Sequence, residues 1–279
     1  MGIAVVGASS FIARALRQRP EAASWRFIGH KEALSTDLWL RGTHTVLNCA
    51  FDDRLKDIAY DAALDVDLRL AEKMRRDQSI HYVMLSSRLA YGSAPGDGRL
   101  SEALVCNPMV PYAKAKIITE NKLAAMLGER LTVLRLSNVF GAEYVPGRKN
   151  FISVATRTLI NDRRIVLDTN PFMERDFVPV TELARSIVRI LAAPMSGTFN
   201  LGAGRGTAIG LIAVWLIKGF GHGDLVINNM RDHDAFWLDM SKANRAFGIE
   251  TVPVSRIQAF CIELGRTLSL STKELLPCA

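Results

Sequence analysis

A tyrosine and a lysine lie four positions apart in the segment Pro111-Tyr112-Ala-Lys-Ala-Lys116. At the start of a helix this spacing places both side chains on one face, one turn from each other. A tyrosine of ordinary pKa, near ~10, is a poor base at neutral pH, and lowering that pKa by about three units requires roughly 4 kcal/mol of phenolate stabilisation. A neighbouring ammonium supplies much of it in a partly buried site. Tyr112 and Lys116 are therefore candidates for moving a proton.

Two serines, Ser86 and Ser87, directly follow an apolar strand pattern at residues 81–85. If that strand belongs to an open parallel sheet, both serines lie beyond its carboxyl end, where such sheets bind ligands. A serine hydroxyl there can polarise a carbonyl group while a tyrosine moves the proton. The Tyr-x-x-x-Lys spacing alone also arises by chance, so the serines strengthen it.

The amino-terminal residues 3–13 have the pattern of an apolar strand, a tight turn of small residues and a helix. Backbone N–H groups in such a turn, together with the helix N-terminus, can bind the pyrophosphate of a dinucleotide. Ser9 and Ser10 can add hydroxyl donors. Gly7 is the only glycine of the turn, so an ordinary strand–turn–helix is the alternative interpretation.

The second strand pattern, residues 25–28, is followed by Gly29-His30-Lys31. An acidic residue at this place typically binds the ribose hydroxyls of NAD. A cation instead attracts a 2′-phosphate, so His30 and Lys31 favour NADP(H) over NAD(H). The alternatives are NAD(H), or two solvated side chains without a ligand.

Strand patterns at residues 3–6, 25–28, 45–49, 81–85 and 131–136 alternate with helical patterns at 12–19, 57–76 and 113–128. This alternation predicts an α/β fold with a Rossmann-like, doubly wound parallel sheet. Only about fifteen residues separate the second strand from the third, too few for a full strand–helix unit, so one unit is expected to be missing. We predict an NAD(P)-binding domain over residues 1–145 and a smaller, mainly substrate-binding C-terminal lobe over residues 146–279, interleaved with it.

Composition excludes several other classes of protein. Hydrophobic residues make up 49% and charged residues 23% of the 279 residues, which excludes a disordered chain. Four scattered cysteines without a C-x-x-C pair predict a reducing compartment and no metal site. The net charge of +7 favours anionic ligands, but no basic cluster carries stacking aromatics, so no nucleic-acid partner is expected. The apolar run at 209–217 is too short to cross a bilayer and no leader pattern begins the chain, which predicts a cytoplasmic protein without membrane attachment.

Five motifs occur in the order seen in extended short-chain dehydrogenases/reductases, the group of NAD-dependent epimerases, dehydratases and reductases that act on nucleotide sugars. They are the Gly7 loop and residues 85–92, 111–116, 134–141 and 175–178. The resemblance runs from residue 3 to about residue 204, and only residues 239–243 and 247–248 are similar beyond it. The chain departs from the family pattern where Ser10 and Ala13 replace the second and third glycines of the loop.

The resemblance implies a role for each site residue. Ser87, Tyr112 and Lys116 would form the catalytic triad. The cofactor would contact the triad's Tyr112 and Lys116 and the following residues: Gly7, Ser9, Ser10, Phe11, Ile12, His30, Lys31, Ala50, Phe51 and Leu85. A nucleotide sugar would be bound by Ser87, Asn138, Asn150 and Arg175. The alternatives are a surface salt bridge from Arg175 to Glu174 or Asp176, and a strand-end cap at Asn138.

The same resemblance restricts the reaction. Related dehydratases carry Thr-Asp-Glu where this chain has Ser87-Arg88-Leu89, and enzymes that epimerise C3 and C5 carry a reactive cysteine at the position of Leu89, so neither reaction is expected. The short chain and the cationic residues 30 and 31 favour a 4-keto sugar reductase. The alternatives are a 4-epimerase with retained NAD and a non-catalytic NAD(P)-sensing regulator. Cys106 either reaches the site or is a bystander thiol.

The helical patterns at residues 57–76 and 113–128 are amphipathic, and the resemblance implies a possible use for them: family members pair these two helices into a four-helix interface of a homodimer, and two-fold dimers are common. Contact with the second lobe is the alternative use of these stripes.

Overall fold

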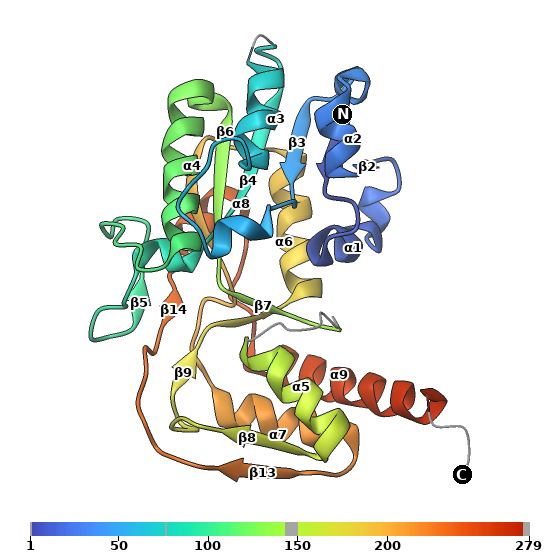
Figure 1. The fold of residues 1–279 in the computed structure, drawn as a ribbon, viewed down its shortest axis with the longest axis vertical. Coiled ribbons are helices and arrows are strands. Elements are labelled where there is room, and N and C mark those ends of the chain that lie inside the picture. Colours follow the sequence, from blue (N-terminus) through green and yellow to red (C-terminus); the bar gives the residue numbers. More distant parts are fainter. Residues whose placement is uncertain (1, 76, 143–149, 276–279) are drawn as a thin grey trace.

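A six-stranded parallel sheet forms the centre of the computed structural model, which describes residues 2–75, 77–142 and 150–275 (Figure 1). The strand order is β11-β6-β4-β3-β1-β2. The strands are β1 (Ile3–Val6), β2 (Arg26–Ile28), β3 (Thr45–Asn48), β4 (His81–Ser87), β6 (Leu131–Leu136) and β11 (Gly197–Leu201). Because β1 lies inside the sheet and the chain proceeds outward from it in both directions, the predicted doubly wound, Rossmann-like fold is confirmed.

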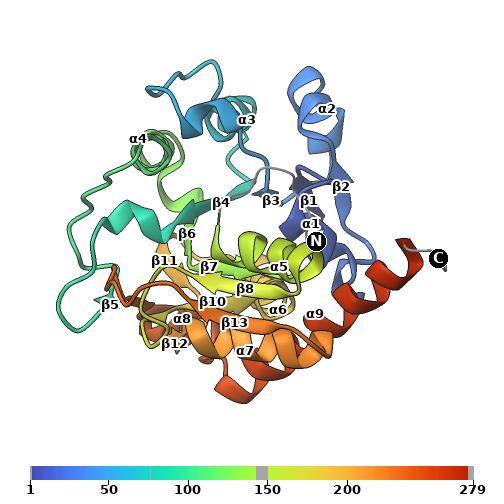
Figure 2. The same cartoon turned by 60° about the horizontal axis from the view of Figure 1, so that its bottom comes forward.

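Helices cover both faces of this sheet, since successive strand residues point to opposite sides. Ala4 and Val6 belong to one apolar core together with helices α2 (His30–Ser35), α3 (Val66–Met74) and α4 (Pro111–Leu127). Ile3 and Val5 belong to the other core, with α1 (Phe11–Arg17), α6 (Val180–Ala192) and α8 (Ser241–Phe247). Figure 2 shows α2, α3 and α4 on the side of the sheet away from α6 and α8.

The expected missing unit is confirmed at the edge of the sheet. Between β2 and β3 the chain forms only α2 and the 3₁₀ helix η2 (Leu38–Leu40). In the described structure β2 therefore forms one edge of the sheet, and β11 forms the other. The other short 3₁₀ helices are η1 (Pro20–Ala22), η3 (Asp53–Lys56), η4 (Arg88–Tyr91) and η5 (Gly128–Arg130).

The predicted helix at residues 57–76 is wrong in its first half. The helix α3 begins only at Val66, because the Asp65 side chain accepts a hydrogen bond from the Leu68 backbone N–H and caps it. The Tyr60 hydroxyl also donates to Asp65, which ties the preceding turns to the same carboxylate. The homodimer that the sequence suggests on this helix and α4 stays a prediction.

The remaining elements form a second lobe below the main sheet in Figure 1. Its helices are α5 (Phe151–Asp162), α7 (Ile209–Phe220) and α9 (Val254–Leu275). Four strand pairs complete it or connect it to the main sheet: β8 (Arg164–Leu167) with β13 (Asp224–Ile227), β9 (Glu174–Arg175) with β12 (Thr207–Ala208), β7 (Asn138–Phe140) with β10 (Phe177–Pro179), and β5 (Arg99–Leu100) with β14 (Trp237–Leu238). The chain re-enters the main sheet at β11, whereas the predicted division after residue 145 stays a prediction.

The apolar run at residues 209–217 is the first part of α7, which packs against α9. Two glycines allow this close approach: a Cβ on Gly219 would lie 1.9 Å from the Ile262 carbonyl oxygen, and one on Gly265 would lie 2.3 Å from that of Leu216. Among the described residues, we find no helix with the length and apolar character needed to cross a membrane.

Candidate active site

The turn after β1 lies against the end of β3. Gly7 has a φ of +86°, and a Cβ there would lie 2.8 Å from the Ala50 backbone nitrogen, so both conformation and space require glycine. Ser10 caps α1 by accepting a hydrogen bond from the Ala13 N–H at 3.2 Å, and its hydroxyl also contacts the Cys49 thiol. The predicted cofactor turn is thus packed against the carboxyl end of β3.

Phe51, three residues beyond β3, contacts both of the predicted acid–base residues. The Tyr112 ring packs edge-on against the Phe51 ring with centroids 5.0 Å apart. The Lys116 Nζ lies 4.7 Å from the centroid of the same ring. Pro111 begins α4, a position that favours helix initiation, so Tyr112 and Lys116 lie one turn apart as predicted. The structure therefore brings Phe51, Tyr112 and Lys116 together.

Lys116 is buried and forms an ion pair that the sequence did not suggest. Its Nζ lies 3.4 Å from Oδ2 of Asp67, on α3, and both side chains are about 95% buried. Burial opposes the charge on Lys116, but the charges of Asp67 and Tyr112 outweigh it and raise the pKa of the lysine. Burial also raises the pKa of Asp67, against the effect of Lys116.

The two serines at the end of β4 have different surroundings. Ser86 is buried, and its hydroxyl donates a hydrogen bond to Glu120 on α4. Ser87 is half-buried, and its Oγ accepts a hydrogen bond from the Leu89 N–H at 3.2 Å, which begins η4. α4 packs against both β4 and η4, so Ser87, where these two elements meet, lies next to the helix that carries Tyr112.

A buried ion pair between α4 and β6 lies next to Ser86, at the end of β4. Arg135 on β6 donates to Oε2 of Glu120 at 2.6 Å, and each side chain is less than a tenth exposed. The Arg135 guanidinium also lies 4.7 Å from the centroid of the Tyr91 ring. Cys106 borders the Tyr91 side of this cluster, and burial raises the pKa of its thiol.

Two arginines face one carboxylate beside η4. Arg88 donates to Oδ2 of Asp234 at 3.2 Å and lies 3.8 Å above the centroid of the Phe236 ring. Arg175, on β9, donates to the Asp234 backbone oxygen at 3.3 Å. Burial lowers the pKa of each arginine, and Asp234 acts in the opposite direction.

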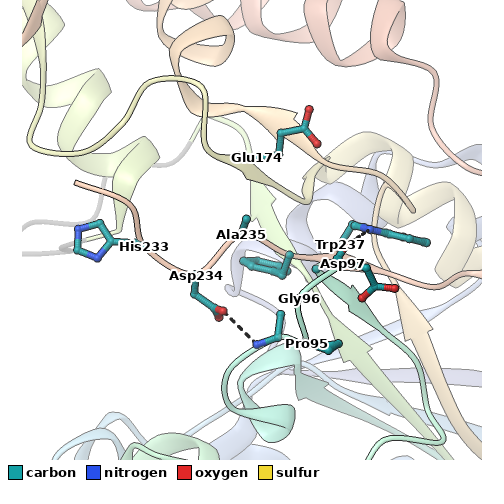
Figure 3. Close-up of a pocket in the computed structure, with 11 residues that line it drawn as sticks. Pro95, Gly96, Asp97, Glu174, His233, Asp234, Ala235 and Trp237 are labelled. Carbon is teal, nitrogen blue, oxygen red and sulfur yellow. Dashed lines mark hydrogen bonds between the residues drawn. The ribbon is translucent and has the colours of Figure 1, made fainter. Parts of the chain in front are cut away.

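A cavity of about 300 Å³ adjoins this pair, between residues 94–98 and residues 233–237 (Figure 3). Asp234 turns toward the first of these segments and accepts a hydrogen bond from the Ala94 N–H at 3.0 Å. The side chains of Asp97, Glu174, His233 and Trp237 also line it. Hydrogen-bond donors and acceptors are thus available beside Arg175.

Comparison with known proteins places the chain in a family. The sequence model of the NAD dependent epimerase/dehydratase family matches residues 42–202, more than half of the chain. The chain belongs to this family. No sequence among curated proteins matches it. The match covers Ser87, Tyr112 and Lys116, whereas the Gly7 turn precedes it.

Solved structures of similar fold cover almost the whole length of this family member. UDP-glucuronic acid 4-epimerase from Bacillus cereus, in complex with UDP-glucuronic acid and NAD, has a TM-score of 0.76 at 19% identity and covers 96% of this chain and 100% of its own. UDP-glucose 4-epimerase from Thermotoga maritima, with UDP-glucose, has a TM-score of 0.79 at 22% identity and covers 96% and 99%. RMD from Pseudomonas aeruginosa, with NADPH, has a TM-score of 0.75 at 20% identity and covers 99% of each chain.

The other residues that the sequence predicts to contact the cofactor lie on β4, in the Gly7 turn, and at the starts of α1 and α2. Ala50 adjoins the Gly7 turn, while Phe11 and Ile12 begin α1, the Phe11 ring lying against Gly141. Leu85 is half-buried on β4, Ser9 is exposed in the turn, and His30 and Lys31 are exposed at the start of α2.

The predicted substrate residues lie toward the second lobe. Asn138 begins β7 and is half-buried. Asn150 is exposed and caps α5 through its Oδ1, which accepts from the Ser153 N–H at 2.8 Å. The suggested salt bridge from Arg175 to Asp176 is wrong, because Asp176 is fully buried and accepts hydrogen bonds from the backbone N–H groups of residues 203, 204 and 238.

Proposed function

We propose that this chain is an NAD(P)-dependent oxidoreductase that reduces the 4-keto group of a nucleotide-linked sugar. The grouping of Tyr112 and Lys116 around Phe51, with Ser87 at the end of the adjacent strand, carries the proposal. The ligands of the similar structures, NAD or NADPH together with UDP-sugars in the two epimerases, support this class of cofactor and substrate.

The residues fit a dinucleotide at the carboxyl edge of the main sheet. The Gly7 turn and the segment that follows β3 converge there, and the Cys49 thiol contacts Ser10 and lies near Lys116. Residues 7 and 9–12 would hold the pyrophosphate, and Ala50, Phe51 and Leu85 would line the nucleoside parts. A bound nicotinamide nucleotide supplies the hydride.

The side chains of the chain itself provide the rest of the chemistry. Tyr112 donates its phenolic proton to the carbonyl oxygen of the sugar, while the Ser87 hydroxyl donates a hydrogen bond to the same oxygen. Lys116 provides positive charge beside the phenol and hydrogen-bond donors for a ribose. Arg175 provides a guanidinium for a diphosphate, and Asn138 and the Nδ2 group of Asn150 would contact the remaining substrate.

Reduction can be distinguished from its alternatives in one assay. Purified protein is mixed with NADPH and a panel of 4-keto nucleotide sugars, and absorbance of the reduced nicotinamide is followed. A loss of absorbance that depends on the sugar supports the reductase. Interconversion of C4 epimers without added cofactor, by protein that carries NAD through purification, would instead identify a 4-epimerase. Cofactor binding without either reaction would identify a sensing regulator.

A preference for NADP(H) is proposed from His30 and Lys31. Asp52, beyond β3, lies near His30. Hydrogen bonds from Arg54, with a smaller effect of His30, lower the pKa of Asp52 to about 2, so the carboxylate is ionised and pairs with Arg54 at 2.6 Å. Because Arg54 engages this carboxylate, the exposed side chains of His30 and Lys31 remain available to bind a 2′-phosphate.

We expect the double variant His30→Ala/Lys31→Ala to raise KM for NADPH about tenfold, since one lost phosphate contact weakens binding by roughly 1.5 kcal/mol. KM for NADH should change less than twofold. Lys56→Ala, which removes a cation paired with Asp53 at 2.6 Å, is the matched control. Equal changes with both cofactors would contradict the preference.

A further inference from the structure

Asp67 provides the negative charge that balances the buried Lys116. Its Oδ2 lies 3.4 Å from Nζ, and its Oδ1 accepts hydrogen bonds at 2.8 Å from the Asn48 amide and from the Tyr82 hydroxyl. These neutral donors come from β3 and β4 and fix the carboxylate from two sides. The carboxylate is thus held rigidly under the lysine, and Lys116 is held with it.

The groups that face this pair come from four elements. They are Asn48 and Cys49 at the end of β3, Asp65 on the α3 cap, Tyr82 on β4 and Tyr112 on α4. Burial raises the pKa of Tyr82 far above its ordinary value and that of Cys49 to about 12, so both are neutral at pH 7. Asp65 is engaged by the Thr119 hydroxyl at 2.6 Å and by Tyr60 at 2.8 Å.

We propose that Asp67 is a positioning residue of the acid–base pair, anchoring the Lys116 ammonium beside Phe51 and offsetting its charge at Tyr112. This inference rests on the proposed function, in which Tyr112 donates a proton. An ammonium without a counter-ion would strongly stabilise the phenolate and favour a proton acceptor. With a carboxylate behind it, the same ammonium leaves the phenol protonated over a wider pH range, as proton donation in ketone reduction requires.

The experiment removes the charge of Asp67 and follows the pH at which the pair loses its proton. Removing a nearby negative charge favours the loss of a proton from the Tyr112 and Lys116 pair, so it lowers the pH at which that loss occurs. In Asp67→Asn the fall in reductase activity at high pH should begin about one pH unit lower than in the wild type. Asp37→Asn removes an exposed carboxylate that pairs with Lys73, outside this cluster, so its profile should stay that of the wild type.

A second readout does not depend on turnover. The ultraviolet phenolate band is titrated in the wild type, in Asp67→Asn and in each protein with Tyr112→Phe added, and the difference isolates Tyr112. Its midpoint should fall by about one pH unit in Asp67→Asn. If Asp67→Asn does not fold, Asp67→Ser removes the same charge, and Asp67→Glu should restore the wild-type midpoint.

The outcomes separate the two proposals. A wild type that binds no nicotinamide nucleotide and turns over no ketosugar would overturn the proposed function, and the phenolate titration would still test Asp67. Unchanged midpoints and pH profiles in the folded charge-removing variants would overturn the role of Asp67 alone. A lower melting temperature with an unchanged midpoint would identify a merely structural residue and also overturn it.

Discussion

Tyr112→Phe is expected to lower kcat about a thousandfold, because the variant lacks the proton that the substrate oxygen must receive and general acid catalysis contributes on this order. The packing of the ring against Phe51, with centroids 5.0 Å apart, does not involve the hydroxyl. The melting temperature and the Kd for NADPH, measured by nicotinamide fluorescence, should therefore remain close to those of the wild type. Single-turnover kinetics at saturating substrate measure the loss in the chemical step.

Tyr91→Phe is the matched control for this prediction. The Tyr91 hydroxyl donates a buried hydrogen bond to Asn200 Oδ1 at 2.6 Å, so its removal costs about 1 kcal/mol of stability. It should change kcat no more than a few fold. If Tyr112→Phe kept wild-type turnover, or if both variants lost activity equally, the assignment of Tyr112 as the proton donor would be contradicted.

Local sequence patterns were sufficient to predict the elements that carry the acid–base residues. The apolar runs of β1 and β6 have the predicted bounds, and α4 begins at Pro111, two residues before the predicted start at 113. Tyr112 and Lys116 share a helix, so their spacing alone predicts their proximity. Parallel pairing then places Ser87 at the carboxyl edge, a consequence of topology that alternating strands and helices also predict.

Long-range contacts of the candidate site could not be predicted in the same way. Asp67 and Lys116 are 49 residues apart, and Arg88 and Asp234 are 146 residues apart. No local periodicity relates such residues, and the apolar spacing of 57–76 even suggested one long helix where turns precede α3. The Asp65 cap was the available signal for the true helix start, since aspartate favours this position.

The ion pair of Glu120 and Arg135 connects α4 to the main sheet next to the end of β4. Burial opposes the charge of Arg135, but the hydrogen bonds that it donates to Glu120, and the charge of that carboxylate, outweigh it and raise the pKa of the guanidinium. The same carboxylate accepts the hydrogen bond of Ser86, next to Ser87. One side chain on α4 therefore satisfies groups on both β4 and β6, and the position of Ser87 depends on it.

Glu120→Ala is expected to lower the free energy of unfolding by about 3 to 5 kcal/mol, because it leaves Arg135 buried without a counter-charge. Urea denaturation should show a lower midpoint with an unchanged slope. Glu21→Ala, which breaks the exposed pair with Arg19, is the control and should be indistinguishable from the wild type.

The double variant Glu120→Met/Arg135→Met separates loss of the ion pair from loss of packing. Replacing both charges by apolar side chains of similar volume removes the uncompensated guanidinium, so most of the lost stability should return. Activity should not return with it, because Ser86 has lost its acceptor and the end of β4 is no longer fixed against α4. A double variant as unstable as Glu120→Ala would mean that shape, rather than charge, determines the stability of this contact.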